Sequence, residues 1–352
     1  MKLRVGITYN LKRHIVTDPP DAEAEFDDMG TILAVKGAIE EKGYEAELFE
    51  SDQTLPVRLA RQRPDIVFNI AEGTNGRGRE AHVPAILSYL GIPYTGSDEV
   101  TMCVTMDKSL TVKLLGLYNI PAPKHILLKA KNYQAGSAAN LTPDIWCGAA
   151  AGITADLTPG ASGPLSFPVI VKPNAEGSGK GISGVSVAAN TDELHNILPK
   201  MFAAYKQDML VEEYIAGREF TVGIIGDGRR ARVFTPMEII FRDNSAGIYS
   251  YEVKRNFKDY VDYKCPPDIS ADKQAELMDT AGKIYDILEC RDFARMDFRM
   301  DAQDNIYFIE INTLPGLAPG YSDYPMLAEY NGIGYNDLVQ RILANAMIRY
   351  GL

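Results

Sequence analysis

Paired polar side chains stand near the end of the chain, in two segments whose other residues are mostly apolar. In FARMDFRM, Arg295 and Asp297 are two residues apart, and in NIYFIEIN, Glu310 and Asn312 have the same spacing. Alternation with period two predicts β-strands and places each pair on one strand face. A buried carboxylate without a partner is costly. These faces therefore require a partner of opposite charge.

A metal ion is one such partner. If the two strands are neighbours, Asp297, Glu310 and Asn312 present two carboxylates and an amide oxygen together. Oxygen donors suit a hard cation such as Mg²⁺, with Mn²⁺ as the alternative, and the cation would offset repulsion between the carboxylates. A structural salt bridge with Arg295 explains the spacing equally well, and the pattern alone leaves both interpretations open.

The segment VIVKPNAEGSGKGISGVSV is rich in glycine. Gly179, Gly181 and Gly184 fit GxGxxG, but a strand rather than a helix is predicted to follow, which does not suit a dinucleotide fold. A glycine-rich hairpin can instead close over phosphates with its backbone N–H groups, and Lys172 at the end of the preceding strand would meet them. The alternative is a flexible hairpin tip with solvated lysines.

Acidic residues flank a predicted strand end in LVEEYIAGREFTV, at Glu212, Glu213 and Glu219. Carboxylates accept hydrogen bonds, so they suit an adenine amino group or a ribose hydroxyl rather than a phosphate. The alternative is an exposed acidic loop.

The elements that position these residues change in kind along the chain. Strands predicted at VGITY, YEAELFE and DIVFNI alternate with helices, one over 31–42, which indicates a parallel, doubly wound α/β sheet. Strands follow one another from Pro168, which indicates an α+β portion. Further helices are predicted over 107–119, 271–288 and 336–350. Residues 130–165, rich in Ala, Gly, Ser, Thr and Pro, predict a long surface insertion.

The bulk properties exclude several partners. The chain has 352 residues, 46% apolar, with a formal net charge of -11, which argues against nucleic-acid binding. It lacks a signal-peptide core and an apolar run of membrane-spanning length, so no membrane partner is expected. Its four cysteines show no CxxC spacing and are typical of reduced thiols in a cytoplasmic protein. The four scattered histidines indicate surface or packing positions.

Taken together, six motifs resemble the ATP-grasp carboxylate–amine ligases, and most closely the D-alanine–D-alanine ligase family. They are IPYTGS, MDKSLT, VIVKP followed by EGS, LVEEYIAGREFTV, ARMDF and EINTLPG. They follow the family's order over roughly residues 66–350, interrupted by the insertion; each alone is weakly specific. The resemblance implies an ATP-grasp fold, commonly a homodimer, with an N-terminal α/β substrate domain (1–104), a central domain (105–220) and a C-terminal domain (221–352) that hold ATP between the last two.

The resemblance also implies roles for individual residues. The phosphates of ATP would contact Lys108 and Lys172, the adenine Glu212 and the ribose Glu219. Mg²⁺ would be bound by Asp297, Glu310 and Asn312. Arg295 and the N–H of Gly316 would stabilise the tetrahedral intermediate, Ser178 would position substrate, Lys254 would reach phosphate from a lid, and Ser322 would hold the second substrate's carboxylate.

The implied chemistry activates a small carboxylate with ATP and Mg²⁺ as an acyl phosphate, which an amine then attacks to form a dipeptide-like amide. Amino acids are the expected substrates. Two alternatives stay open: a non-catalytic ATP-binding regulatory protein, and a phosphotransferase that uses the same ATP site.

Departures from the family pattern fall on the first-substrate pocket. The Gly-Gly-x-Ser loop after the first strand is missing, the family's His-Gly appears as Glu72-Gly73, and the lid tyrosine as Arg255. Countercharge for a donor amino group would come from Glu72 or from the acidic run Asp21, Glu23, Glu25, Asp27 and Asp28. Arg77, Arg79 and Arg255 favour a donor with an extra anionic group over D-alanine. In the alternative, the arginines form salt bridges with the acidic run and the pocket still takes D-alanine.

Overall fold

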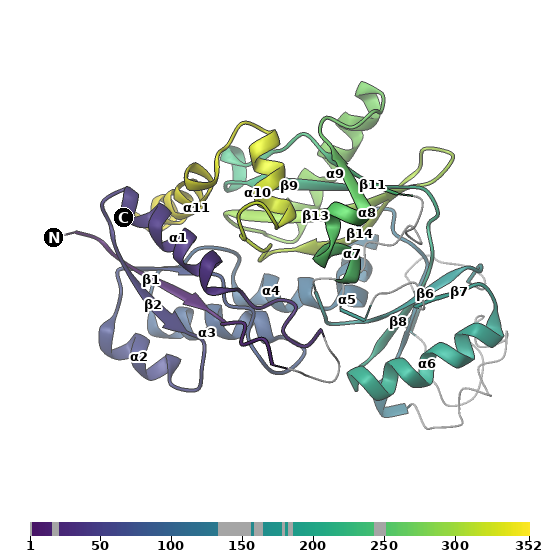
Figure 1. Ribbon diagram of the computed structural model, residues 1–352, viewed down its shortest axis with the longest axis horizontal. Coiled ribbons are helices and arrows are strands. Elements are labelled where there is room, and N and C mark those ends of the chain that lie inside the picture. Colours follow the sequence, from purple (N-terminus) through teal and green to yellow (C-terminus); the bar gives the residue numbers. More distant parts are fainter. Residues whose placement is uncertain are drawn as a thin grey trace.

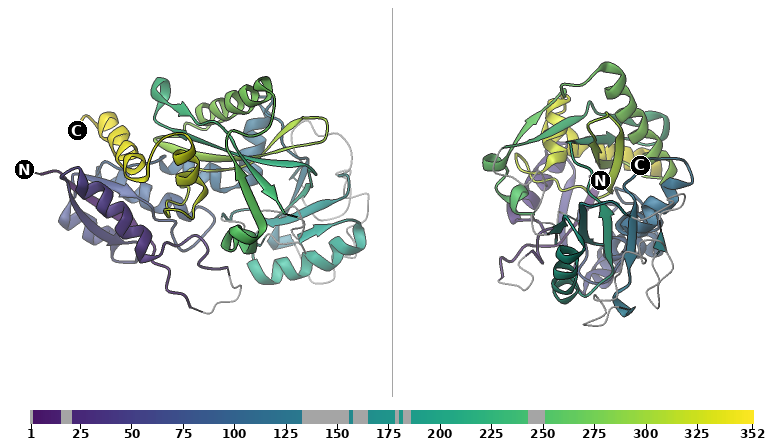
Figure 2. Two further views of the ribbon diagram at one scale, coloured as in Figure 1. Left: turned by 45° about the horizontal axis from the view of Figure 1, so that its top comes forward. Right: turned by 90° about the vertical axis from the view of Figure 1, so that its right-hand side faces the viewer.

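The computed structural model describes residues 2–15, 21–132, 156–157, 165–177, 180–181, 186–242 and 251–352. Three β-sheets with flanking helices follow one another along the chain (Figure 1). Both termini lie at one end of the molecule, beside the first sheet, and the second sheet lies at the opposite end (Figures 1 and 2).

The first sheet is parallel, as predicted, with strand order β2-β1-β3. Its strands are β1 (Arg4–Tyr9), β2 (Glu45–Glu50) and β3 (Ile66–Asn69). Its helices are α1 (Met29–Glu41), α2 (Leu55–Gln62) and α3 (His82–Leu90), preceded by the short 3-10 helix η1 (Arg79–Ala81). Every residue of β3 is buried, which explains why DIVFNI is apolar throughout rather than alternating.

Two short helices lead to the second sheet, α4 (Glu99–Met106) and α5 (Lys108–Gly116). The carboxylate of Asp98 caps α4 by accepting from the N–H groups of Val100 and Thr101, and Asp107 caps α5 by accepting from the N–H of Leu110. Such caps satisfy N–H groups that lack a partner inside the helix. Lys108 therefore stands at a fixed position, the first residue of α5.

The second sheet is antiparallel, with strand order β5-β4-β8-β6-β7. Its strands are β4 (His125–Leu128), β5 (Asp156–Leu157), β6 (Val169–Pro173), β7 (Val187–Ala188) and β8 (Met209–Glu213), with η2 (Ala130–Asn132) and helix α6 (Thr191–Tyr205) beside them. The pairing of β6 with β7 confirms the predicted hairpin around the glycine-rich loop. Residues 133–155 and 158–164 of the predicted insertion lie outside the described residues.

The third sheet is antiparallel, with order β12-β11-β9-β13-β14 and β10 beside β9, which confirms the α+β prediction. Its strands are β9 (Arg218–Ile225), β10 (Arg232–Val233), β11 (Met237–Phe241), β12 (Val261–Lys264), β13 (Phe293–Met300) and β14 (Ile306–Asn312). Its helices are α7 (Tyr251–Arg255), α8 (Phe257–Tyr260), α9 (Ala271–Ile287), α10 (Asp323–Tyr330), α11 (Tyr335–Tyr350) and η6 (Gly228–Arg230). Leu277, Ala281 and Ile284 of α9 pack in one core with the apolar residues of β9 and β13.

The last helix returns to the beginning of the chain. Helix α11 packs against α1, and Figures 1 and 2 show the two side by side. Val35 and Ile39 of α1 share a buried core with Leu338 and Ile342 of α11. The first and third sheets are therefore held together by one apolar core, which fixes the gap between them.

Two simpler observations complete the fold. None of the helices in the described ranges is long and apolar enough to cross a membrane. Cys103, Cys265 and Cys290 are free thiols, and Cys147 lies outside the described residues.

Candidate active site

The polar pairs of β13 and β14 lie next to each other, as predicted. In the antiparallel pairing, Asp297 stands opposite Glu310 and Arg295 opposite Asn312. The register shifts just after Asp297, so that Phe298 pairs with Phe308. A bulge of this kind bends a strand locally and redirects its side chains. The two strands thus bring two carboxylates, one amide and one guanidinium together at one end of the ladder.

Arg295 is buried between two carboxylates. Its Nε and Nη2 donate to Asp297 at 3.1 and 2.9 Å, and its Nη1 lies 3.5 Å from Asp323. The salt bridge that the sequence left open is therefore present for Asp297. It accounts for neither Glu310 nor Asn312, because neither side chain pairs with Arg295 within the described residues.

Glu310 faces a surplus of positive charge. Its carboxylate lies 3.4 Å from Nζ of Lys108. Burial alone would raise its pKa, but the ammonium groups of Lys108, Lys254 and Lys172 outweigh burial and lower the pKa to about 2. Three ammonium groups around one carboxylate leave room for further negative charge, as a chain of phosphates would supply.

The donor set fits a hard cation. Glu310 is ionised at neutral pH. The buried Nδ2 of Asn312 has no hydrogen-bond partner in the described part of the chain, which leaves this donor available to an acceptor such as a phosphate oxygen. Carboxylate and amide oxygens with phosphate oxygens are the ligands that Mg²⁺ takes beside nucleotides. Asp297, Glu310 and Asn312 are the residues that would hold it.

Two predicted nucleotide contacts pair with each other across β6 and β8. Nζ of Lys172 lies 2.6 Å from Oε1 of Glu212, and both side chains are buried. Glu219 lies on β9, with Arg299 of β13 3.9 Å away. Burial raises the pKa of Glu219 to about 7, although Arg299 opposes the shift. These pairs fix the side chains near the junction of the second and third sheets.

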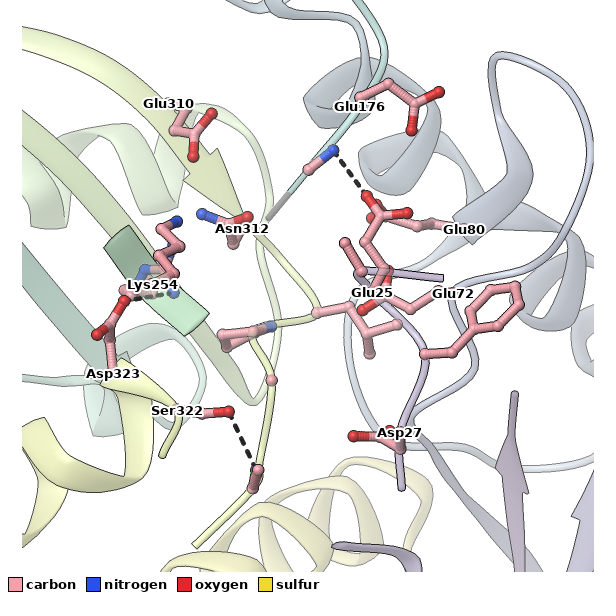
Figure 3. A pocket seen from close by; sticks show the side chains of 18 of the residues that line it. Glu25, Asp27, Glu72, Glu80, Glu176, Lys254, Glu310, Asn312, Ser322 and Asp323 are labelled. Atoms are coloured by element: carbon pink, nitrogen blue, oxygen red, sulfur yellow. Dashed lines mark hydrogen bonds and ion pairs between the residues drawn. The ribbon is translucent and has the colours of Figure 1, made fainter. Parts of the chain in front are cut away.

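A cavity of about 140 Å³ opens where the three sheets meet. Figure 3 shows Lys254, Asn312, Ser322 and Asp323 on one side of it and Glu25, Asp27, Glu72 and Glu80 on the other. The first group comes from the third sheet and its loops, the second from the loops around the first sheet. The cavity therefore has an acidic wall and, opposite it, a cationic wall where Lys254 and Arg295 lie near the amide of Asn312.

Gly316 belongs to the loop that leads from β14 past this cavity. A Cβ at this position would lie 2.9 Å from Oγ of Ser322, which in turn accepts a hydrogen bond from the N–H of Ala318 at 3.1 Å. Contacts below 3.0 Å force something to move. A side chain at position 316 would therefore displace the hydroxyl of Ser322 from its place beside the cavity.

The structure brings most of the predicted site residues to this cavity, but not all. Those that line it are Lys108, Lys254, Arg295, Glu310, Asn312, Gly316, Ser322 and Glu72. Asp297 reaches it through Arg295. Lys172, Glu212 and Glu219 lie outside its lining, and Ser178 lies outside the described residues. Arg255 is exposed at the end of α7 and does not line the cavity, so its predicted role in substrate binding finds no geometric support.

The arginines expected to attract an anionic donor are neutralised. Nη2 of Arg79 lies 2.6 Å from both carboxylate oxygens of Glu25 and 3.1 Å from Glu176. Arg77 is exposed and lies 3.5 Å from Asp107. The alternative, in which arginines pair with the acidic run, is therefore the arrangement observed at Arg79. The charge argument for an anionic donor therefore loses the support of Arg79.

Three acidic residues of the cavity were missed by sequence reasoning. Glu80, Glu176 and Asp323 all line it. Glu80 lies in NGRGRE and Glu176 in the glycine-rich loop, where charged residues are common in exposed turns. The only sequence signal for these two glutamates was their position near motif residues, Glu80 after Glu72 and Glu176 after Lys172.

Comparisons with known proteins agree with this geometry. The model of the D-ala D-ala ligase C-terminus matches residues 153–344. An uncharacterised protein of Sinorhizobium fredii, y4sG, is 31% identical over 90% of this chain and 87% of its own length. A D-alanine–D-alanine ligase of Novosphingobium aromaticivorans is 30% identical over 89% of both chains. The crystal structure of D-alanine–D-alanine ligase from Bacillus anthracis complexed with ATP aligns over 99% of both chains with a TM-score of 0.71 and 20% identity.

The fold and the site thus define an ATP-grasp enzyme, an ATP-dependent ligase that joins a carboxylate to an amine. The chain belongs to the D-alanine–D-alanine ligase family.

Proposed function

We propose that this protein is an amino-acid ligase that uses ATP and Mg²⁺ to activate the carboxylate of one amino acid and joins it to the amine of a second small molecule. The observation that carries the proposal is the cavity itself. It places the cations around Glu310 opposite an acidic wall, with Arg295 and Gly316 between them. A zwitterionic substrate would direct its carboxylate to the first wall and its ammonium to the second.

The residues of the cationic wall do separate work. Lys108 and Lys254 would lie against the phosphates and neutralise the charge that moves during phosphoryl transfer. Bound Mg²⁺ would supply additional charge neutralisation at the phosphates. Asp297, Glu310 and Asn312 would hold it. Lys172, Glu212 and Glu219 would contact the nucleotide from outside the cavity, and Ser178 would position the substrate.

Amine attack on the acyl carbon then develops a negative oxygen. Arg295 cannot turn away from this centre, because Asp297 and Asp323 hold its guanidinium on both sides. Its positive charge and the backbone N–H of Gly316 would stabilise the oxyanion, and preorganised donors of this kind lower the barrier most when water is excluded. Ser322, at the end of the same loop and directly before α10, would bind the carboxylate of the second substrate.

The proposal is tested by screening pairs of amino acids with ATP and Mg²⁺ for phosphate release, with each product identified by mass spectrometry. We expect stoichiometric ADP, phosphate and an amide. A phosphorylated product without an amide would identify a phosphotransferase instead. ATP binding without turnover on any pair would identify the regulatory alternative.

The homodimer and the three-domain division also remain proposals. Helices α3 and α4 expose Tyr89 and Val100, and Leu117, directly after α5, is also exposed, which supports an interface on this side of the molecule. Sedimentation of the full chain would measure the mass in solution, and a monomer at micromolar concentration would contradict the dimer.

A further inference from the structure

The acidic wall of the cavity carries carboxyl groups that the protein itself does not pair. Asp27, Glu72 and Glu80 all line the cavity. Within the described ranges, no side-chain hydrogen bond or ion pair is made by any of these three carboxyl groups. Glu72 and Glu80 lie close to Glu25, because oxygens from all three glutamates fall within 4.8 Å of one another. Figure 3 shows these side chains directed toward the cavity.

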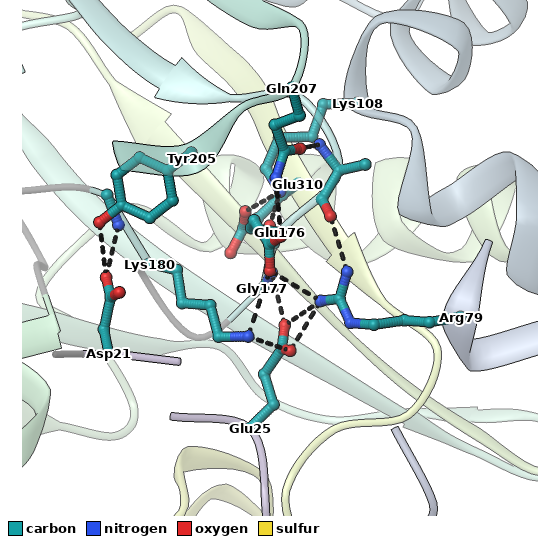
Figure 4. A network of polar contacts seen from close by, with 12 residues as sticks. Asp21, Glu25, Arg79, Lys108, Glu176, Gly177, Lys180, Tyr205, Gln207 and Glu310 are labelled. Carbon is teal, nitrogen blue, oxygen red and sulfur yellow. Dashed lines mark hydrogen bonds and ion pairs between the residues drawn. The ribbon is translucent and has the colours of Figure 1, made fainter. Parts of the chain in front are cut away.

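The fourth carboxylate of this wall is different, because Glu25 is fully paired. It accepts from Arg79 at 2.6 Å, from Nζ of Lys180 at 2.7 Å and from the N–H of Gly177 at 2.7 Å (Figure 4). Arg79 and Lys180 also lie 3.1 and 3.2 Å from Glu176. Two cations and two carboxylates form a closed, neutral group. Glu25 therefore keeps no capacity for a substrate ammonium or a metal ion.

The three carboxyl groups feel nearby cations without pairing with them. Lys12 acts on Asp27, and Arg79 and Lys108 act on Glu80, but none of these cations makes an ion pair with the three carboxyl groups within the described residues. Burial raises the pKa of Asp27 and of Glu80 to about 7, and it raises the pKa of Glu72 well above its usual range, with Glu80 adding to the shift. Buried carboxylates normally have a cationic partner or a metal. The protein leaves these without one at the place where substrate binds.

A simple amino acid would pair with only part of this wall. One α-ammonium group beside Asp27 would leave Glu72 and Glu80, whose oxygens lie within 4.8 Å of each other, without a cation. A second positive group on the same molecule would fit between these two. A divalent metal in its place would need a third ligand, and the nearest candidate, Glu25, is already occupied by Arg79 and Lys180.

We propose that the acyl donor is an amino acid with a cationic side chain, an amine or a guanidine, whose side-chain cation lies between Glu72 and Glu80. This inference rests on the proposed ligase function and names the substrate class of the same site. The α-carboxylate of the donor would then face Lys254 and Arg295 across the cavity, and its two positive groups would face the acidic wall. Glu72 and Glu80 are specificity-determining residues in this arrangement.

The test compares donors that match in length and differ in charge. Lysine, ornithine and arginine, as both enantiomers, are set against norleucine, glutamine and glutamate with one common set of acceptor amines. Because a hydrogen bond to a charged group contributes about 1.5–3 kcal/mol, we expect kcat/KM for the best cationic donor to exceed that of its neutral match by about 10- to 100-fold. Glutamate should be the poorest donor.

Two variants locate the effect. Glu72→Gln and Glu80→Gln keep the side-chain size and remove the charge. We expect each to raise KM for the cationic donor about 10-fold or more, to raise KM for the neutral donor less, and to change kcat little, so that the preference shrinks. Glu45→Gln, on the exposed start of β2, is the matched control and should change neither. Thermal unfolding of each variant shows that the fold is retained.

The outcomes separate the two proposals. Amide formation that is equal for neutral and cationic donors, or a cationic preference that survives both Glu72→Gln and Glu80→Gln, would overturn the cationic donor and keep the ligase. Absence of amide with every donor, despite ATP binding, would overturn the ligase function itself.

Discussion

Replacement of Arg349 by methionine tests whether the last helix is tied to the rest of the protein by charge as well as by apolar contact. Nη1 and Nη2 of Arg349 lie 2.6 and 2.9 Å from the two oxygens of Asp292, and Nη1 lies 2.7 Å from Asp227. Nη2 also donates to the carbonyl of Tyr94 at 2.9 Å. Asp292 is 0% exposed. The substitution would leave this carboxylate buried without its cation.

The expected loss follows from that burial. Removing one partner of a buried ion pair costs about 3–5 kcal/mol. An unfolding entropy of about 2.1 cal/mol/K per residue gives about 740 cal/mol/K for a chain of 352 residues, so Tm should fall by about 4–7 °C. Burial already raises the pKa of Asp292 to about 7, against the opposing effect of Arg349. Because Asp292 is then protonated at pH 6 and ionised at pH 8, the loss should be larger at pH 8.

The assay is thermal unfolding of the wild type, Arg349→Met and Arg341→Met at pH 6 and pH 8. Arg341 lies on the same helix in an exposed pair with Asp337 at 2.9 Å, and such pairs contribute less than about 1 kcal/mol. If Arg349→Met at pH 8 loses no more stability than Arg341→Met, the buried ion pair does not hold the helix as we infer.

Three further predictions concern the site. Glu310→Gln should lower kcat about 10³-fold or more, because charge neutralisation by a bound metal contributes several kcal/mol; phosphate release measures it, and normal turnover with intact circular dichroism would refute the role. Arg295→Met should lower kcat by about 10²–10³-fold, with ATP binding by calorimetry retained; unchanged turnover would remove it from the mechanism. Burial raises the pKa of Glu80 to about 7 in the folded state, above its value in the unfolded state. Its contribution to stability is therefore fully present below about pH 4.5 and is lost as the pH rises through 7. Between pH 5 and pH 8, the free energy of unfolding of Glu80→Gln should therefore rise by up to about 3 kcal/mol relative to that of the wild type, as measured by urea titration. A difference in unfolding free energy that does not change with pH would contradict this.

The sequence predicted those parts of the site that lie on regular strands. Alternation was enough to place Arg295 with Asp297, and Glu310 with Asn312, on one strand face, because a strand face is determined by residue parity. The register that sets Asp297 opposite Glu310 came from the structure. Local sequence signals also placed two further motifs. Lys108 follows the cap of a helix, and Gly316 lies in a loop after a strand. The parallel first sheet followed from strand–helix alternation.

Pairing between distant loops could not be predicted in the same way. Arg79 meets Glu25 across 54 positions, and Lys180 meets it across 155. No periodicity links such residues, so the sequence could not show that Glu25 is neutralised while Glu72 and Glu80 are not. For this reason the sequence left open whether the arginines face a substrate or pair with the acidic run.

The core shared by α1 and α11 has a consequence for how the protein is made. Val35, Ala38 and Ile39 are covered by Leu338 and Ile342, which the ribosome adds about 300 residues later. At about 5–20 residues per second, the apolar side of α1 waits roughly 15–60 s for its cover during synthesis. A chain released before residue 338 would keep this surface exposed and would be a substrate for chaperones or proteases. The second sheet is different, because its strands come from residues 125–213 and are all synthesised long before α11.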